Sequence, residues 1–172
     1  MMSLLFVLIA PLPAQNEEIK KLEDFSEKQK TTLEYSEDDM VNIPGMDISM
    51  APPSHFEYDE SLPGFLHKGT SASIQILEVQ NIKMETVTKS LTETYFEQQG
   101  FQLEKESVLL LDNGKKAKIY LTNYNVNDED YQRIFFFTGG KNTIWINVNY
   151  PAVVKDLIYK PIISSLKTIK HN

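Results

Sequence analysis

Alternating apolar and polar positions predict a sheet-rich domain that begins at residue 43. Met46, Ile48 and Met50 alternate with polar residues, which is the two-residue period of a half-buried strand. Prolines and glycines divide the positions that follow into short segments, as expected of tight turns between strands. Further strands are predicted at residues 56–58, 65–68 and 72–79.

The period changes to three and four residues between Lys83 and Gln99, which predicts one amphipathic helix. Gly100 is suited to end that helix, because glycine readily adopts the left-handed backbone of the residue after a helix. The apolar stripe consists of Met84, Val87, Leu91 and Tyr95.

A second helical pattern follows Pro151 and continues to Leu166. Pro161 lies inside this pattern, and proline both lacks the N–H donor and crowds the preceding turn. The sequence therefore predicts two short helices, or one helix with a kink at Lys160.

Between the two helical patterns, four strands are predicted in a meander. Asn113-Gly114 is a strong two-residue hairpin signal. A four-residue turn is predicted at 139–142, and a polar six-residue loop at 125–130. The strands are placed at residues 108–112, 115–124, 131–138 and 143–150.

These turn lengths set a register that makes both faces of the sheet apolar. Val108 is expected opposite Ile119, Ile119 opposite Phe136, and Phe136 opposite Trp145. One face then carries Val108, Leu110, Ile119, Leu121, Ile134, Phe136 and Trp145. The other carries Tyr120, Phe135, Phe137, Ile144, Ile146 and Val148. A sheet that is apolar on both faces must be covered on both, so the sequence predicts an α+β fold: a three-layer α/β/α sandwich whose central, mainly antiparallel sheet is covered by helices on both faces.

The N-terminal pattern predicts export. A short apolar run, Leu4–Ala10, is followed by a proline-containing break and then Ala14, the layout of a secretory signal peptide. Residues 1–14 are thus the predicted signal peptide, and residues 15–42 a charged tether with 9 acidic and 4 basic residues. The expected location is periplasmic or secreted, with no membrane span after signal removal.

Composition limits the possible chemistry. The chain has 172 residues, of which 41% are hydrophobic, enough for one domain with a real core. Residues 43–172 hold 15 acidic and 13 basic residues, and a nearly neutral domain argues against nucleic-acid binding. The absence of cysteine excludes disulfides, thiolate nucleophiles and cysteine metal ligands.

Candidate chemistry is sparse. His55, Glu57 and Asp59 share one face if that stretch is extended, which is compatible with a metal site or a cryptic hydrolase. A solvated strand face is the simpler interpretation, so no catalytic residue, metal or cofactor is predicted. Phe136 and Trp145 form a candidate aromatic pocket, although packing in the core under a helix is the favoured interpretation, because both faces of the predicted sheet are apolar.

The turn formed by Leu62, Pro63, Gly64 and Phe65 is the candidate partner contact. Two apolar side chains at an exposed turn can meet a partner protein. They can also anchor the loop to the domain.

The order of turns and strands resembles the PsbP-like class of small secreted bacterial proteins. The resemblance rests on Ile43-Pro44-Gly45, Met50-Ala51-Pro52-Pro53, Leu62-Pro63-Gly64-Phe65 and Ser73-Ile74-Gln75-Ile76. That class shares its fold with the lumenal photosystem II extrinsic subunit and with a Ran-binding nuclear import factor of the Mog type. The resemblance implies a central antiparallel sheet between helices over residues 43–172, and a role in binding or assembly without a catalytic set.

Three functional hypotheses follow. The first is an exported, non-enzymatic protein that binds another protein or an assembly. The second is a binder of a small ligand or lipid that uses a pocket near Phe136 and Trp145. The third is a hydrolase with a cryptic site around His55, Glu57 and Asp59.

Overall fold

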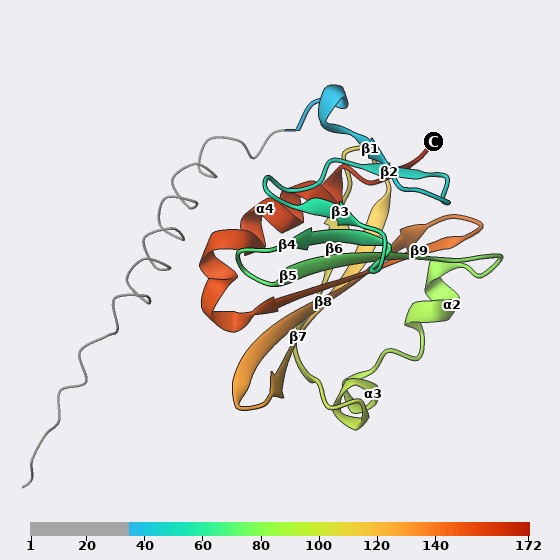
Figure 1. Ribbon diagram of the computed structural model, residues 1–172. Helices are drawn as coiled ribbons and strands as arrows, with labels where there is room; N and C mark the ends of the chain where they lie inside the picture. The colour runs from blue at the N-terminus through green and yellow to red at the C-terminus, as the bar shows by residue number, and fades with distance from the viewer. Residues whose placement is uncertain (1–34) are drawn as a thin grey trace, which may run out of the picture. The chain divides into compact units, whose positions relative to one another are not determined.

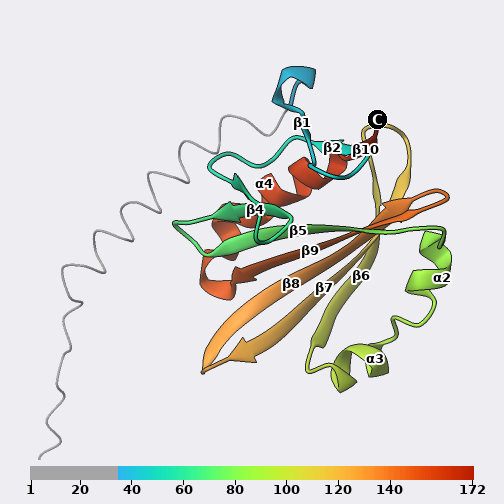
Figure 2. The same cartoon turned by 45° about the vertical axis from the view of Figure 1, so that its right-hand side comes forward.

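A seven-stranded antiparallel sheet forms the centre of the described part of the chain, with the strand order β3-β4-β5-β9-β8-β7-β6 (Figures 1 and 2). The computed structural model describes residues 35–172. The strands of this sheet are β3 (Glu57–Asp59), β4 (Gly64–His67), β5 (Ala72–Val79), β6 (Gln102–Leu110), β7 (Lys116–Val126), β8 (Glu129–Gly139) and β9 (Thr143–Pro151). The predicted signal peptide and most of the predicted tether lie outside the described residues.

A second, small sheet joins the beginning and the end of the described residues. It contains β1 (Val41–Asn42), β2 (Ile48–Met50) and β10 (Lys170–His171), with β2 in the middle. A short 3-10 helix, η1 (Glu37–Asp39), precedes it. The segment after β2 is tied to the C-terminal helix, because the N–H of Ala51 donates to Thr168 Oγ1 at 2.9 Å and Ser165 Oγ donates to the Ala51 carbonyl.

The pairing of β7 with β8 agrees with the predicted register. Ile119 lies opposite Phe136, and Tyr120 opposite Phe135. The loop between these strands is shorter than expected, because the ladder continues to Val126 and Glu129 and closes on a two-residue turn. Both turn residues, Asn127 and Asp128, have positive φ, as the tight turn of a twisted hairpin requires.

The other two predicted registers are each wrong by one residue. Trp145 lies opposite Phe137, not Phe136, because β8 extends to Gly139 and the loop has three residues, 140–142. Val108 lies opposite Lys118, not Ile119. A slip of one residue moves a side chain to the opposite face of the sheet.

The observed faces therefore differ from the predicted ones. One face presents Ile119, Leu121, Ile134, Phe136, Ile144, Ile146 and Val148, all buried. The other carries Tyr120, Phe135 and Phe137, which form a buried cluster with Phe96 of α3, and Trp145 packs against this cluster. Val108 and Leu110, which were predicted to be in the core, are 63% and 62% exposed on the edge strand β6.

The single helix predicted at Lys83–Gln99 is two helices, α2 (Met84–Thr88) and α3 (Glu93–Gln98). Thr92 starts the second one, since its side chain accepts a hydrogen bond from the N–H of Tyr95 at 3.2 Å. Threonine and serine compete for backbone hydrogen bonds, which explains why the predicted helix breaks between Thr88 and Thr92. Gly100 has φ +80° and ends α3 as predicted.

The C-terminal helix is continuous, contrary to the predicted split or kink at Lys160. A 3-10 turn, η2 (Ala152–Val154), leads into α4 (Lys155–Lys167), which runs through Pro161. Packing compensates for the hydrogen bond that proline cannot make, because Ile158, Pro161, Ile162 and Leu166 are all buried.

The layers are consequently unequal. Helix α4 covers one side of the large sheet, whereas the short helices α2 and α3 lie on the other side and contact β6, β8 and β9 (Figures 1 and 2). The α+β class and the mainly antiparallel sheet are confirmed. A complete three-layer sandwich is not confirmed, because the helices of residues 35–172 cover only part of the second face.

Within residues 35–172, the structure contains no helix of the length and apolarity that a membrane span requires.

A glycine substitution tests the packing of β4 against β5. A Cβ at Gly64 would stand 1.9 Å from the carbonyl oxygen of Ile74, which is backbone and cannot move aside cheaply. We expect Gly64→Ala to lower the free energy of unfolding by at least about 2 kcal/mol, measured by urea unfolding. Gly140→Ala is the matched control, since nothing lies within 4 Å of its added Cβ. Its effect should stay within about 0.5 kcal/mol, and equal losses in both variants would contradict the clash.

Candidate functional site

The uncovered part of the second sheet face carries polar side chains in two rows across four strands. Register places Thr122, Arg133, Asn149 and Ser73 in one row, from β7 to β5. The next row runs Tyr120, Phe135, Asn147 and Gln75. We call the partly exposed polar members of these rows the open face: Ser73, Gln75, Arg133 and Asn149. Thr122 and Asn147, in the same rows, are buried.

Within the second row, the side chains change from aromatic to polar beyond the part of the sheet that α2 and α3 contact. Tyr120 and Phe135 are buried under Phe96 of α3. In the same row, Asn147 and Gln75 are polar, and β5 lies beyond the strands that α2 and α3 chiefly contact. A polar sheet face without a covering helix is a surface that can meet a ligand or another molecule.

Arg133 is the centre of the open face and the only arginine of the chain. Its guanidinium carbon lies 4.9 Å from the ring centroid of Phe101, 5.2 Å from that of Tyr124 and 5.6 Å from that of Phe135. Its Nε donates a hydrogen bond to Oδ1 of Asn149. Three rings and one amide thus hold the guanidinium in place.

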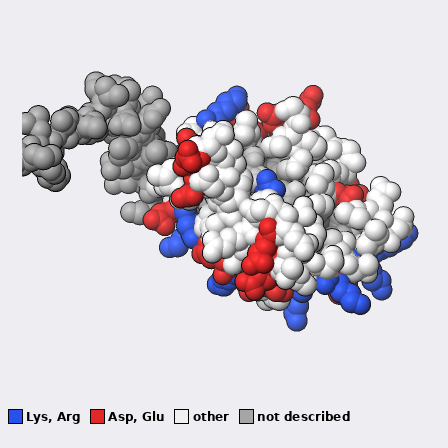
Figure 3. Space-filling model, turned by 90° about the horizontal axis from the view of Figure 1, so that it is seen from below, with Lys and Arg blue, Asp and Glu red and all other residues white. Residues whose placement is uncertain are grey.

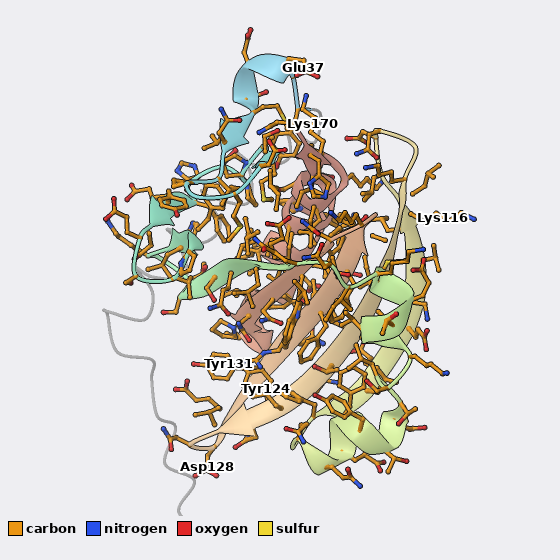
Figure 4. All side chains as sticks on the ribbon, turned by 90° about the vertical axis from the view of Figure 1, so that its right-hand side faces the viewer. Glu37, Lys116, Tyr124, Asp128, Tyr131 and Lys170 are labelled. Atoms are coloured by element: carbon orange, nitrogen blue, oxygen red, sulfur yellow. The ribbon has the colours of Figure 1, made fainter. Side chains whose placement is uncertain are left out.

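The partners of Arg133 are themselves held. The hydroxyl of Tyr124 also donates to Asn149 Oδ1, at 3.2 Å, which orients the amide. Tyr124 packs against Phe101 and Tyr131, with ring centroids 5.3 and 5.5 Å apart. Figure 4 shows Tyr124 and Tyr131 together near the end of the β7–β8 hairpin, whose turn carries Asp128. We call Phe101, Tyr124, Arg133, Phe135 and Asn149 the Arg133 cluster.

The single tryptophan borders the open face. Trp145 stacks on Phe137 with a centroid distance of 5.6 Å, and its Nε1 donates to Asn147 Oδ1 at 2.8 Å. It is partly exposed. Its indole therefore reports on the environment of the open face.

Four lysines of residues 35–172 form ion pairs with glutamates, whereas Arg133 does not. Ion pairs in residues 35–172 join Lys68 to Glu57, Lys118 to Glu106, Lys155 to Glu104 and Lys170 to Glu37. Arg133 has no carboxylate partner within the described residues. Figure 3 shows the domain from below, relative to Figure 1. Acidic and basic side chains are interspersed on this side, and no large area of one sign covers it.

The domain also has two open depressions, and Arg133 lines neither of them. One has a volume of about 460 Å³. Its lining is largely polar: Gly100, Gln102, Asn123, Tyr124, Asn125, Asp130 and Ala152. The other, of about 270 Å³, includes Tyr35 and lies where Glu37 and Lys170 form their ion pair (Figure 4). Burial raises the pKa of Tyr35 to about 12, so this hydroxyl stays protonated and is a poor general base.

The predicted partner contact at the β3–β4 turn is partly inside the protein. Gly64 and Phe65 are buried, and Phe65 packs edge-on against Tyr58 at 5.7 Å. Leu62 and Pro63 are half-buried, and the carbonyl of Pro63 accepts from the N–H of Ile76 at 2.9 Å. The turn therefore has a clear structural role as an anchor of β4 and β5.

The predicted pair Phe136 and Trp145 is not brought together. Phe136 lies opposite Ile146 and is fully buried on the face under α4. Trp145 lies opposite Phe137 on the other face. The one-residue difference in register thus removes the geometric basis of a shared aromatic pocket.

His55, Glu57 and Asp59 do not converge either. Glu57 pairs with Lys68 at 2.9 Å, while Asp59 accepts hydrogen bonds from the backbone and side chain of Ser61, which lower the pKa of its carboxyl group. His55 lies before the strand in a turn with φ +65°. Among residues 35–172, no group of three or more acidic or histidine side chains could hold a metal ion.

The Arg133 cluster was missed in the sequence. Its signal was a lone arginine in a strand of aromatic and apolar residues, Tyr131 to Phe137. A charge at that position is incompatible with a face fully covered by a helix. Only the correct register shows that it shares a face with Asn149 and Ser73.

Comparison with known proteins supports the fold. The structure is similar to the solution structure of cyanobacterial PsbP (CyanoP) from Synechocystis sp. PCC 6803, with a TM-score of 0.51 and 12% identity, over 77% of this chain and 91% of that one. It also matches a crystal structure from Bacteroides thetaiotaomicron with a TM-score of 0.48 and 14% identity, over 73% of this chain and 45% of that one. The chain thus spans less than half of the Bacteroides protein. No protein-family model and no curated protein matches the sequence.

The likeness to the cyanobacterial PsbP structure shows a PsbP-like fold, as the sequence resemblance predicted. At 12% identity it shows the fold alone, so any function must be argued from the residues of this chain.

His67 gives a test of burial by pH. It is buried beside Phe56, and burial, followed by the nearby His55, lowers its pKa below the ordinary 6.5. Just below pH 6.5, His67 is protonated in the unfolded chain but largely neutral in the folded one. The free energy of unfolding should therefore fall as the pH falls through 6.5.

The measurement is urea unfolding at about pH 7.5 and about pH 5.5 for the wild type and for His67→Asn. The asparagine oxygen can accept from the N–H of Thr70, as His67 Nδ1 does at 3.0 Å, but it does not titrate. The variant should lose less stability between the two pH values. Equal losses would mean that His67 does not contribute.

Proposed function

We propose that the protein is an exported, non-enzymatic binding protein whose open face is the contact surface for another protein. The observation that carries this proposal is the Arg133 cluster, in which one tyrosine ring and two phenylalanine rings surround an arginine on a part of the sheet that no helix of residues 35–172 covers. Arginine, tyrosine and tryptophan are the residues that most often dominate the energy of protein interfaces.

The arrangement along the strands supports this choice. Partly exposed aromatic residues lie at both ends of the open face, Tyr124 and Tyr131 at one end and Trp145 at the other. Amide and hydroxyl side chains lie between them. A partner strand or loop laid across β8, β9 and β5 would meet apolar anchors and hydrogen-bonding groups together.

The titratable groups favour binding over catalysis. General acid–base chemistry needs a group whose pKa lies near the working pH in a cleft. The buried tyrosines move away from that range, because burial raises the pKa of Tyr150 as well as that of Tyr35. Tyr150 is engaged in structure, since its hydroxyl donates to Gln132 Oε1 at 3.0 Å.

Export is part of the proposal and rests on the N-terminal pattern. If the signal peptide is residues 1–14, the mature protein recovered from the exported fraction should begin at Gln15. N-terminal sequencing and intact mass measure this directly. A protein that stays in the cytoplasm with residue 1 intact would contradict export.

Site-specific photo-cross-linking tests the contact surface. We expect a photoreactive residue in place of Ser73 or Gln75, on the open face, to give a cross-linked product of discrete mass in the producing cell. The control position is Val153, which is 89% exposed and lies outside the open face. Products that form equally from position 153, or that are missing at both open-face positions, would overturn the proposed surface.

A further inference from the structure

We infer that Arg133 binds a carboxylate group of the partner protein. This inference rests on the proposed function and assigns the chemistry of its central contact. The carboxylate is that of an aspartate, a glutamate or a chain terminus.

The hydrogen-bonding capacity of Arg133 is only partly used. A guanidinium has N–H donors on Nε and on both Nη atoms, in a planar fork that matches a carboxylate. Nε donates to Asn149. Within residues 35–172 no hydrogen bond to the protein uses either Nη atom, so the end of the fork is available for a bidentate contact.

The guanidinium is also held in advance of binding. Phe101, Tyr124 and Phe135 surround its carbon at 4.9 to 5.6 Å, and Asn149 is fixed by a second donor, the Tyr124 hydroxyl. A side chain that is already ordered loses little conformational entropy when it binds. The rings also exclude part of the water, which strengthens a charge-assisted hydrogen bond.

The local charge favours a carboxylate over a phosphate. The neighbours of Arg133 in its row are Thr122, Asn149 and Ser73, all neutral. One cation is balanced by one singly charged group, whereas a phosphate carries more charge and is usually met by several donors or cations. Glu129 lies near Tyr131 on the same hairpin, and its charge would further disfavour a doubly charged anion.

The open geometry favours a carboxylate on a polypeptide over a free small acid. Small-molecule sites enclose most of their ligand. Arg133 lines neither of the two depressions described above, and the larger one meets the Arg133 cluster only at Tyr124. A peptide can cover the rings of Phe101 and Tyr124 while its acidic side chain meets the guanidinium. A peptide bound in this way shields the ion pair between its carboxylate and Arg133 from water. The pair then contributes more to the binding free energy than an ion pair on an exposed surface does.

The single arginine gives a direct readout. The Nε–Hε group of Arg133 produces one arginine side-chain signal in a ¹H–¹⁵N spectrum of the full mature chain. We would titrate this protein with acetyl-Tyr-Gly-Glu-Gly-Tyr-amide, in which the glutamate is the only charge, and with the glutamine analogue of the same peptide. The glutamate peptide should shift the signal in a saturable way, and the glutamine peptide should bind at least tenfold more weakly.

Variants separate the fork from the charge. Arg133→Lys keeps the charge without the planar fork, and Arg133→Gln removes the charge. Both variants should bind the glutamate peptide at least tenfold more weakly than the wild type. Trp145 fluorescence measures this binding. Lys68→Gln, at an exposed ion pair outside the open face, is the control and should bind as the wild type does. Undiminished binding by both Arg133 variants would overturn the inference, provided that their spectra show the wild-type fold.

Two further probes identify the source of the carboxylate. Glutarate should bind more weakly than the glutamate peptide, because it covers less of the cluster. Glutarate binding as tightly as the peptide would overturn the assignment to a polypeptide, and tighter binding of inorganic phosphate would overturn the assignment to a carboxylate.

The two proposals fail separately. Cross-linking from position 73 that persists in Arg133→Gln would leave the open face as the contact surface and overturn the role of Arg133. Binding of the glutamate peptide without any cross-linked partner in the cell would support the carboxylate site and contradict the proposed function.

Discussion

The alternation of side chains along β8 is the constraint on which the rest of the structure depends. Ile134 and Phe136 point to the face under α4, whereas Arg133, Phe135 and Phe137 point to the other. Because β8 lies between β7 and β9, apolar surface has to be covered on both sides of the same strand. The long helix α4 covers one side along its length, and two short helices cover the other only in part.

The partial cover explains where the polar residues can lie. Helices α2 and α3 have 5 and 6 residues, too few to extend across β9 to β5 while packing on Phe137 and Phe135. Beyond them, Asn149 and Gln75 are partly exposed, and the buried Asn147 makes hydrogen bonds with Trp145 and Gln75. The change from aromatic to amide side chains within a single row thus marks the edge of the helix layer.

The sequence was sufficient for the strands and their neighbours, but not for every register. The β7–β8 register came out correctly because a six-residue loop and the observed two-residue turn share the same centre. The β8–β9 register failed because Gly139, at φ +127°, continues β8 and lies where a Cβ would meet the Asn142 carbonyl oxygen at 2.2 Å. At Asn113 the side chain donates to the carbonyl of Ile169 at 3.1 Å, a tertiary contact that local turn rules do not contain.

The error in the β8–β9 register also explains why the site could not be predicted. Arg133 shares a row with Asn149 and Ser73 only in the observed register. Three cation–π contacts, each of about 0.5–1 kcal/mol at an exposed site, and a hydrogen bond to Asn149 hold the guanidinium in place. Together they are comparable to the roughly 1.5–3 kcal/mol that burial of a leucine or methionine against the same rings would contribute. The contacts of the guanidinium with its neighbours therefore account for the ordered position of Arg133. They do not use its two Nη groups, which make no hydrogen bond within residues 35–172, and these are the donors that the proposed partner contact would engage.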